Sequence, residues 1–115
     1  MKKNDYLGNL KTLIETGSPR LAKRHRLAFK NCFGAIAGYV DDNIFISCGK
    51  FGVALRLPPR ILADLFKEAG VTPLKYFPNG HVKKEYAVIP SRILDNRARF
   101  RQLLDKSIKY AYSRK

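Results

Sequence analysis

Apolar residues recur at the spacing of an α-helix in three stretches of the chain. The first stretch begins after Asp5, a typical N-cap residue, and places Leu7, Leu10 and Ile14 on one face before Gly17. Glycine after the last periodic residue is a common C-terminal stop because it adopts the left-handed conformation without strain. We therefore predict an amphipathic helix from Asp5 to Gly17.

The other two helical patterns lie in the second half of the chain and follow prolines. Pro58-Pro59 precedes one helix, which Gly70 ends, and Ser91 after Pro90 can cap the other. Their apolar stripes are Ile61, Leu62, Leu65, Phe66 and Ala69 in the first, and Phe100, Leu103, Leu104, Ser107, Ile108 and Ala111 in the second. A further segment that opens at Ser18-Pro19 is compatible with a short helix or with a loop.

Short apolar runs joined by turn residues occupy the middle of the chain. Phe33 to Val40, Ile44 to Cys48 and Phe51 to Leu57 are separated by Asp41-Asp42-Asn43 and by Gly49-Lys50, a pattern typical of three strands in tight hairpins. Strict alternation would put one set of side chains on one face of each strand. These sets are Ile44, Ile46 and Cys48 in the second strand, and Phe51, Val53, Leu55 and Leu57 in the third.

A second pair of strands is predicted around Pro78-Asn79-Gly80. Leu74 to Phe77 and Val82 to Ile89 flank this turn, in which Asn-Gly accepts positive φ angles. The elements then run α-β3-α-β2-α. The fold class that this order predicts is α+β in two layers, with about five mainly antiparallel strands packed against helices.

Length and composition limit what else the chain can be. With 115 residues and 45% hydrophobic residues, it is long enough to form one core without metal or disulfide support. It contains no apolar run of the roughly 20 residues that a membrane-spanning helix needs and no N-terminal apolar signal segment, so we expect a cytoplasmic protein. Two cysteines without a CxxC or Cys/His cluster predict neither a zinc site nor a bound cofactor.

Charge is the strongest compositional signal. The 23 Lys and Arg residues against 9 Asp and Glu give a formal net charge of +14, which favours polyanionic partners such as nucleic acid. The excess concentrates in a connector before the first strand and on the polar face of the last helix. The candidate phosphate-binding residues are Arg20, Lys23, Arg24, Arg26, Lys30, Arg97, Arg101, Lys106 and Lys109. The alternative is that these cations are dispersed and solvated, and serve solubility.

Other candidate chemistry is sparse. Tyr110 and Tyr112, which we expect in an exposed basic tail, could stack on unpaired bases, although aromatic residues near basic ones are more often packing residues. The predicted hairpin places Cys48 opposite Ala35 or Ile36, too far from Cys32 for a disulfide. Neither cysteine has a neighbouring base, and no convergent set of polar groups supports an enzyme.

Five ordered motifs resemble the N-terminal domain of the TfoX competence-regulator family. They are Cys32-Phe33-Gly34-Ala35, Gly38-Tyr39-Val40-Asp41, Leu55-Arg56-Leu57-Pro58, Pro73-Leu74-Lys75-Tyr76 and Glu85-Tyr86-Ala87-Val88-Ile89-Pro90. Cys32 stands where the family usually has Met, and Ala35 where it has a second Gly. The resemblance implies a single domain with a core over residues 29–112, preceded by an extension and connector over residues 1–28, and a secretion-chaperone-like α+β layer.

The resemblance also implies a function. Larger proteins with this domain promote the expression of DNA-uptake genes, so we expect a non-enzymatic regulatory domain that contacts a protein partner through its sheet face or edge. A homodimer is one form that such contact could take. The alternative is a direct nucleic-acid binder of low specificity that uses the basic surface.

Overall fold

A computed structural model describes residues 5–17, 26–32, 34–75 and 82–113 of the chain. The elements in chain order are α1 (Tyr6–Gly17), β1 (Leu27–Cys32), β2 (Ala35–Val40), β3 (Asn43–Gly49), β4 (Gly52–Arg56), α2 (Pro59–Leu65), β5 (Thr72–Leu74), β6 (Lys83–Ile89), α3 (Ser91–Leu94) and α4 (Arg97–Tyr112). The segment at Ser18-Pro19 and the turn at Asn79-Gly80 lie outside the described residues.

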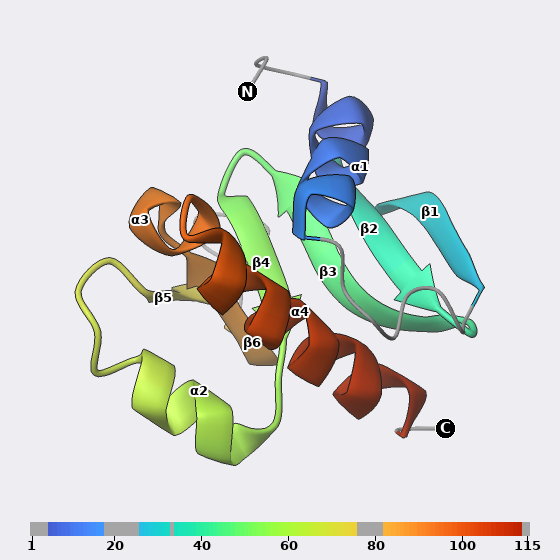
Figure 1. The fold of residues 1–115 in the computed structure, drawn as a ribbon. Coiled ribbons are helices and arrows are strands. Elements are labelled where there is room, and N and C mark those ends of the chain that lie inside the picture. The colour runs from blue at the N-terminus through green and yellow to red at the C-terminus, as the bar shows by residue number, and fades with distance from the viewer. Residues whose placement is uncertain (1–4, 18–25, 33, 76–81, 114–115) are drawn as a thin grey trace.

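The strands form one antiparallel sheet in the order β1-β2-β3-β4-β6-β5, and helices cover one of its faces (Figure 1). The predicted α+β class is confirmed, and the sheet has six strands where about five were expected. The additional strand is β1, which begins at the end of the predicted connector and runs through residues for which no strand was predicted. Its residues Leu27 and Phe29 pair with Val40 and Gly38, and both pack against the core from the edge of the sheet.

A two-residue turn joins β2 to β3, as the run of turn residues predicted. Val40 pairs with Asn43, and the intervening Asp41 and Asp42 have φ angles of 48° and 70°. Two consecutive positive φ angles define the type I′ turn, whose twist matches that of the flanking strands. The Asp41 carboxylate accepts a hydrogen bond of 3.2 Å from the backbone N–H of Arg26, which ties this turn to the start of β1.

A bulge in β3 changes the predicted assignment of its faces. Gly38 pairs with Ile46 but the next residue, Tyr39, pairs with Ile44, so one extra residue, Phe45, is accommodated in β3. The prediction that Ile44, Ile46 and Cys48 share a face is wrong for Ile44, because the bulge reverses the alternation. Ile46 and Cys48 lie in the core, where Phe45 is also fully buried.

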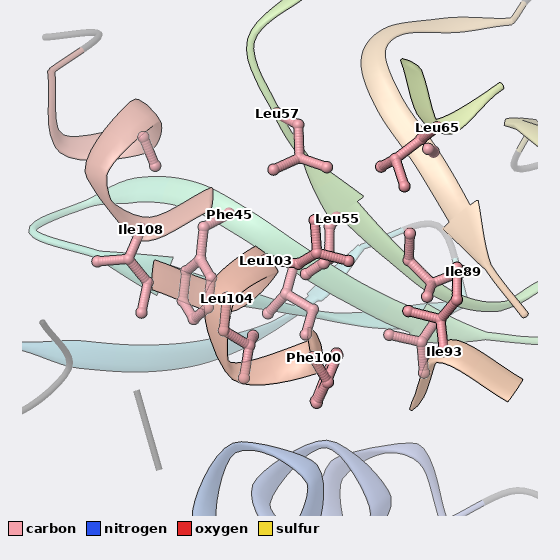
Figure 2. Packing of buried hydrophobic residues seen from close by; sticks show 14 of the residues in the cluster. Phe45, Leu55, Leu57, Leu65, Ile89, Ile93, Phe100, Leu103, Leu104 and Ile108 are labelled. Carbon is pink, nitrogen blue, oxygen red and sulfur yellow. The ribbon is translucent and has the colours of Figure 1, made fainter. Parts of the chain in front are cut away.

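The core lies between the sheet and the helices, mainly under α4. Phe100, Leu104 and Ile108 of α4 are buried against strand residues such as Phe45 and Leu55 (Figure 2). Helix α1 contributes Leu10 and Ile14 to the same cluster. The buried face of α4 is therefore the predicted stripe, which leaves the opposite face of this helix to solvent.

Three element boundaries differ from those predicted. Helix α2 ends at Leu65, so Phe66 and Ala69 are exposed and do not extend its apolar stripe. Strand β5 begins earlier than predicted, at Thr72. Ser91 does not cap the long last helix, because the chain turns after the short α3 and α4 begins anew at Asn96, whose side chain accepts a hydrogen bond from the backbone N–H of Arg99.

Phe51 also departs from its predicted position. It lies in the turn before β4, half-buried, with its ring beside Gly49 and not in the core with Val53 and Leu55. The tight β3–β4 turn pairs Gly49 with Gly52, so Phe51 falls outside the alternation of the strand. Leu57 is fully buried in the core, as predicted.

Candidate interaction surface on the last helix

The nine predicted phosphate-binding residues divide into three groups. Arg20, Lys23 and Arg24 lie outside the described residues. Arg26 directly precedes β1, Lys30 lies in the middle of that strand, and the remaining four lie on α4. Among the described residues of this set, only the four on α4 lie together on one helix.

Lys30 lies on the face of the sheet opposite to α4. Its Nζ lies 5.1 Å from the centre of the Tyr39 ring, whereas its neighbour Phe29 points toward the core and lies under Lys11 of α1. Adjacent residues of a strand point to opposite faces, so Lys30 and the α4 cations do not form one surface. Arg26 forms an exposed ion pair with Asp42, in which Nη2 of Arg26 lies 3.1 Å from Oδ1 of Asp42.

The cations of α4 surround its solvent-exposed side. Arg97, Lys106 and Lys109 are exposed and Arg101 is half-buried. Within the described part of the chain, Arg101, Lys106 and Lys109 form no ion pair, although Asp105 stands at a helical spacing from two of them. We call Arg97, Arg101, Lys106 and Lys109 the α4 basic face.

One flank of α4 is fixed to the segment that follows α2 by a carboxylate between two guanidinium groups. Glu68 accepts hydrogen bonds from both terminal nitrogens of Arg99, one of them at 2.7 Å, and lies 3.5 Å from Arg92 Nη1. The hydrogen bond from Arg99 lowers the pKa of Glu68 below its ordinary value, and the same bond raises the pKa of Arg99. The sequence gives no sign of this cluster, because the three residues are brought together only when α3, α4 and the segment after α2 dock.

A second cluster fixes Tyr110 near the end of α4. Its hydroxyl donates a hydrogen bond of 3.0 Å to Glu85, and the guanidinium of Arg56 lies 5.7 Å from the centre of its ring. Arg56 in turn pairs with Glu85 at 2.8 Å and donates to the backbone carbonyl of Ile44 at 3.3 Å. Tyr110 and Tyr112 are therefore half-buried residues of α4 and not members of an exposed tail, which was the basis for expecting them to stack on bases.

Between α2 and α4 runs a groove formed by two neighbouring cavities. One, of about 290 Å³, lies at the start of α2, lined by Pro58, Ile61, Lys106, Lys109, Tyr110 and Tyr112. The other, of about 180 Å³, shares Ile61 and Lys106 with it and continues toward Asp64 and the ion-paired Glu68. The groove thus joins the α4 basic face to apolar surface, a combination that sequence periodicity did not reveal.

Cys48 offers little nucleophilic chemistry. Cys48 pairs with Ile36 across the β2–β3 hairpin, which is one of the two partners that the sequence predicted. Burial raises the pKa of its thiol, so the neutral form is favoured at physiological pH. Residues 5–17, 26–32, 34–75 and 82–113 contain no cluster of three His, Cys, Asp or Glu side chains that could hold a metal ion.

None of the helices in the described ranges combines the length and the apolar character needed to cross a membrane. The four helices instead each bury part of one face against the sheet or against each other, as in the case of α2 with Leu62 and Leu65.

Comparison with known proteins gives one family. The sequence profile of the TfoX N-terminal domain matches residues 20–111 of the chain, which include every described strand, the α4 basic face and most of the groove lining, though not Tyr112. No curated protein matches the chain.

Proposed function

The chain belongs to the TfoX N-terminal domain family, and we propose that it acts as a non-enzymatic regulatory domain that binds another protein. The domain takes part in controlling the expression of DNA-uptake genes and is located in the cytoplasm. The resemblance of its motifs to competence regulators supports the regulatory part of this proposal.

The observation that carries the binding role is the composition of the surface around α4. The cations Arg101, Lys106 and Lys109 have no described carboxylate partner, and two of them border an apolar cavity beside α2. Patches that combine apolar area with a charged rim are typical of protein interfaces. Structural cations of the same protein are ion-paired, as Arg56 and Arg99 are.

Co-purification tests the binding role. A tagged chain expressed in its own cells at native level is expected to retain a discrete protein in a constant ratio after chemical cross-linking. Deletion of the gene is expected to lower the transcript levels of DNA-uptake genes, and re-expression of the chain is expected to restore them. A chain that stays monomeric in light scattering at high concentration, retains no protein and leaves those transcripts unchanged would show that the proposal is wrong.

A second candidate function, direct nucleic-acid binding of low specificity, is favoured by the same cations, which have no carboxylate partner among the described residues. Fluorescence anisotropy with duplex and single-stranded DNA at several salt concentrations tests it. For duplex DNA, each lost phosphate contact should reduce the slope of log affinity against log salt by about 0.9, so R101E/K109E should reduce it by about 1.8. The control K30E/K50E removes the same charge from positions off the groove and should leave that slope nearly unchanged if α4 makes the contacts. Equal slopes for both variants would exclude α4 as the binding surface.

A further inference from the structure

The larger cavity of the α2–α4 groove has an apolar floor and a basic rim. Pro58 and Ile61 at the start of α2 form one wall, and Tyr110 of α4 forms part of the other. Lys106 and Lys109 border the opening, and both side chains are exposed. A cavity of about 290 Å³ has room for one large apolar side chain, whose burial would be favourable.

The wall at Tyr110 is held in place before any ligand arrives. Glu85 accepts from the Tyr110 hydroxyl and from Arg56 Nε at 3.0 and 2.8 Å. The backbone of Glu85 has a φ angle of 73°, a conformation that L residues other than Asn, Asp and Gly rarely adopt. Strained backbone that surrounding contacts maintain is a feature of ligand-binding sites, where preorganisation lowers the entropic cost of binding.

The charge of the groove changes along its length. At the end near Tyr110, Lys106 and Lys109 lack a described carboxylate partner. At the other end the groove is lined by Asp64 and Glu68 together with Arg99 and Lys106, and Glu68 is already paired with Arg99. A ligand that follows the groove therefore meets only cations beside the apolar cavity and both signs of charge farther along.

We propose that this cavity binds an apolar side chain of a protein partner that is flanked by aspartate or glutamate residues. The flanking carboxylates would pair with Lys106 and Lys109, whereas the apolar side chain would contact Pro58 and Ile61. The groove suits a nucleic-acid strand less well, because a continuous row of phosphates would approach Asp64 and Glu68. One face of the Tyr110 ring is also covered by Arg56, which reduces its use for base stacking. This inference rests on the proposed function, since it names the chemistry of the partner.

Backbone amide shifts of the isotope-labelled chain test the proposal directly. The probe is a short synthetic peptide with one central leucine flanked by glutamates, and the matched probes replace the leucine with serine or the glutamates with lysines. Oligothymidylate of similar length is the nucleic-acid probe. The leucine-glutamate peptide should shift the amides of Ile61 and of residues 106–113 in a saturable manner, and each matched probe should bind at least about tenfold more weakly.

Two charge variants locate the binding surface. K106E/K109E and K30E/K50E both lower the formal net charge from +14 to +10, because each Lys→Glu change removes two charges. Lys30 lies on the opposite face of the sheet, and Lys50 lies in the β3–β4 turn, at the end of β4 remote from Pro58. We expect K106E/K109E to weaken peptide binding at least about tenfold and K30E/K50E to change it by less than about threefold. I61A should weaken binding as well, through lost apolar contact.

Several results would overturn the inference: equal responses to the leucine and serine peptides, equal effects of the two charge variants, or tighter binding of oligothymidylate in the groove. Failure of the inference can be told apart from failure of the proposed function. If the partner found by co-purification binds K106E/K109E as well as the unchanged chain, the function stands and the groove is not the site. If the peptide binds in the groove but no partner is retained and the transcripts are unchanged, the groove chemistry stands and the proposed function fails.

Discussion

Two serines are fully buried in the fold, and they differ in one respect that predicts opposite effects of the same substitution. Ser107 of α4 donates a hydrogen bond of 2.6 Å to the backbone carbonyl of Phe45 at the β3 bulge. Ser47, two residues farther along β3, has a side-chain oxygen with no hydrogen-bond partner. Replacing each with alanine removes the same oxygen atom from an environment of equal exposure.

The expected magnitudes follow from these contacts. Ser107→Ala removes the hydroxyl donor from the carbonyl of Phe45, which costs about 1–3 kcal/mol, and recovers about 0.5 kcal/mol because alanine is the better helix former. We expect a net loss of about 0.5–2.5 kcal/mol in the free energy of unfolding. Ser47→Ala removes a buried hydroxyl that has no partner, so it should be neutral or stabilising by up to about 1 kcal/mol.

Equilibrium unfolding in urea measures both values in one experiment. The two variants should have equal m-values and midpoints that move in opposite directions relative to the unchanged chain, or remain fixed for Ser47→Ala. In thermal unfolding they should differ by roughly 5 °C or more. Equal destabilisation by both substitutions would refute the reasoning, since the presence of the hydrogen bond would then have no measurable consequence.

Three further substitutions test other contacts. Glu68→Gln should lower stability by about 1 kcal/mol near neutral pH, because a carboxylate whose pKa is lowered by Arg99 stabilises the fold above its unfolded pKa of about 4.3. Acid unfolding curves should show this difference disappear as the pH falls through the lowered pKa of the folded state, and a constant difference would contradict the assignment. Asp42→Gly should raise the thermal midpoint, because glycine adopts the positive φ angle of position 42 without strain. The substitution also removes one exposed ion pair, so the net gain in the free energy of unfolding should be about 0.5 kcal/mol in denaturant titration. Gly38→Ala should lower stability by about 1–3 kcal/mol in the same titration, since its new Cβ would lie 2.6 Å from Cγ2 of the fully buried Ile46, and an unchanged midpoint would show that the bulge can relax.

The sequence predicts the elements whose pattern is strong and misses those that depend on docking. The stripe from Phe100 to Ala111 is buried as expected, and the paired aspartates form the expected turn between β2 and β3. Strand β1 was missed because Lys30 and Asn31 extend the basic, polar character of the preceding connector into it. An edge strand needs only one buried face and one neighbour, so its alternation is short and weak.

The bulge at Phe45 was missed for a different reason. Alternation of apolar residues cannot distinguish a regular strand from one in which an inserted residue reverses the faces, because Ile44, Phe45 and Ile46 are all apolar. Two contacts mark the position of the bulge in the folded chain. Ser107 donates a hydrogen bond to the carbonyl of Phe45, and Gly38 leaves room for the side chain of Ile46. Such three-dimensional constraints lie far apart in the sequence.

The candidate surface was predicted only in part. The cations of α4 could be assigned to its polar side from their spacing, and Arg97, Lys106 and Lys109 are exposed there whereas Arg101 is half-buried. The groove could not be predicted, because Pro58 and Tyr110 approach one another only after α2 and α4 dock. The cluster of Arg56, Glu85 and Tyr110 could not be predicted either, because its residues lie on three separate elements and no local sequence pattern relates them.

The distribution of the few carboxylates explains why α4 keeps an excess of positive charge on its outer side. Of the 9 acidic residues, Asp105 lies on α4 itself, and Glu68 and Glu85 contact the helix, where these two bind groups that fix it in place, namely Arg99 and the Tyr110 hydroxyl. They do not neutralise Lys106 or Lys109, which repel one another and the rest of a chain of charge +14. If those lysines served the fold, their replacement by glutamate would destabilise it. We expect instead that K106E/K109E unfolds at equal or higher urea concentration while its binding is impaired, which is the signature of residues retained for recognition.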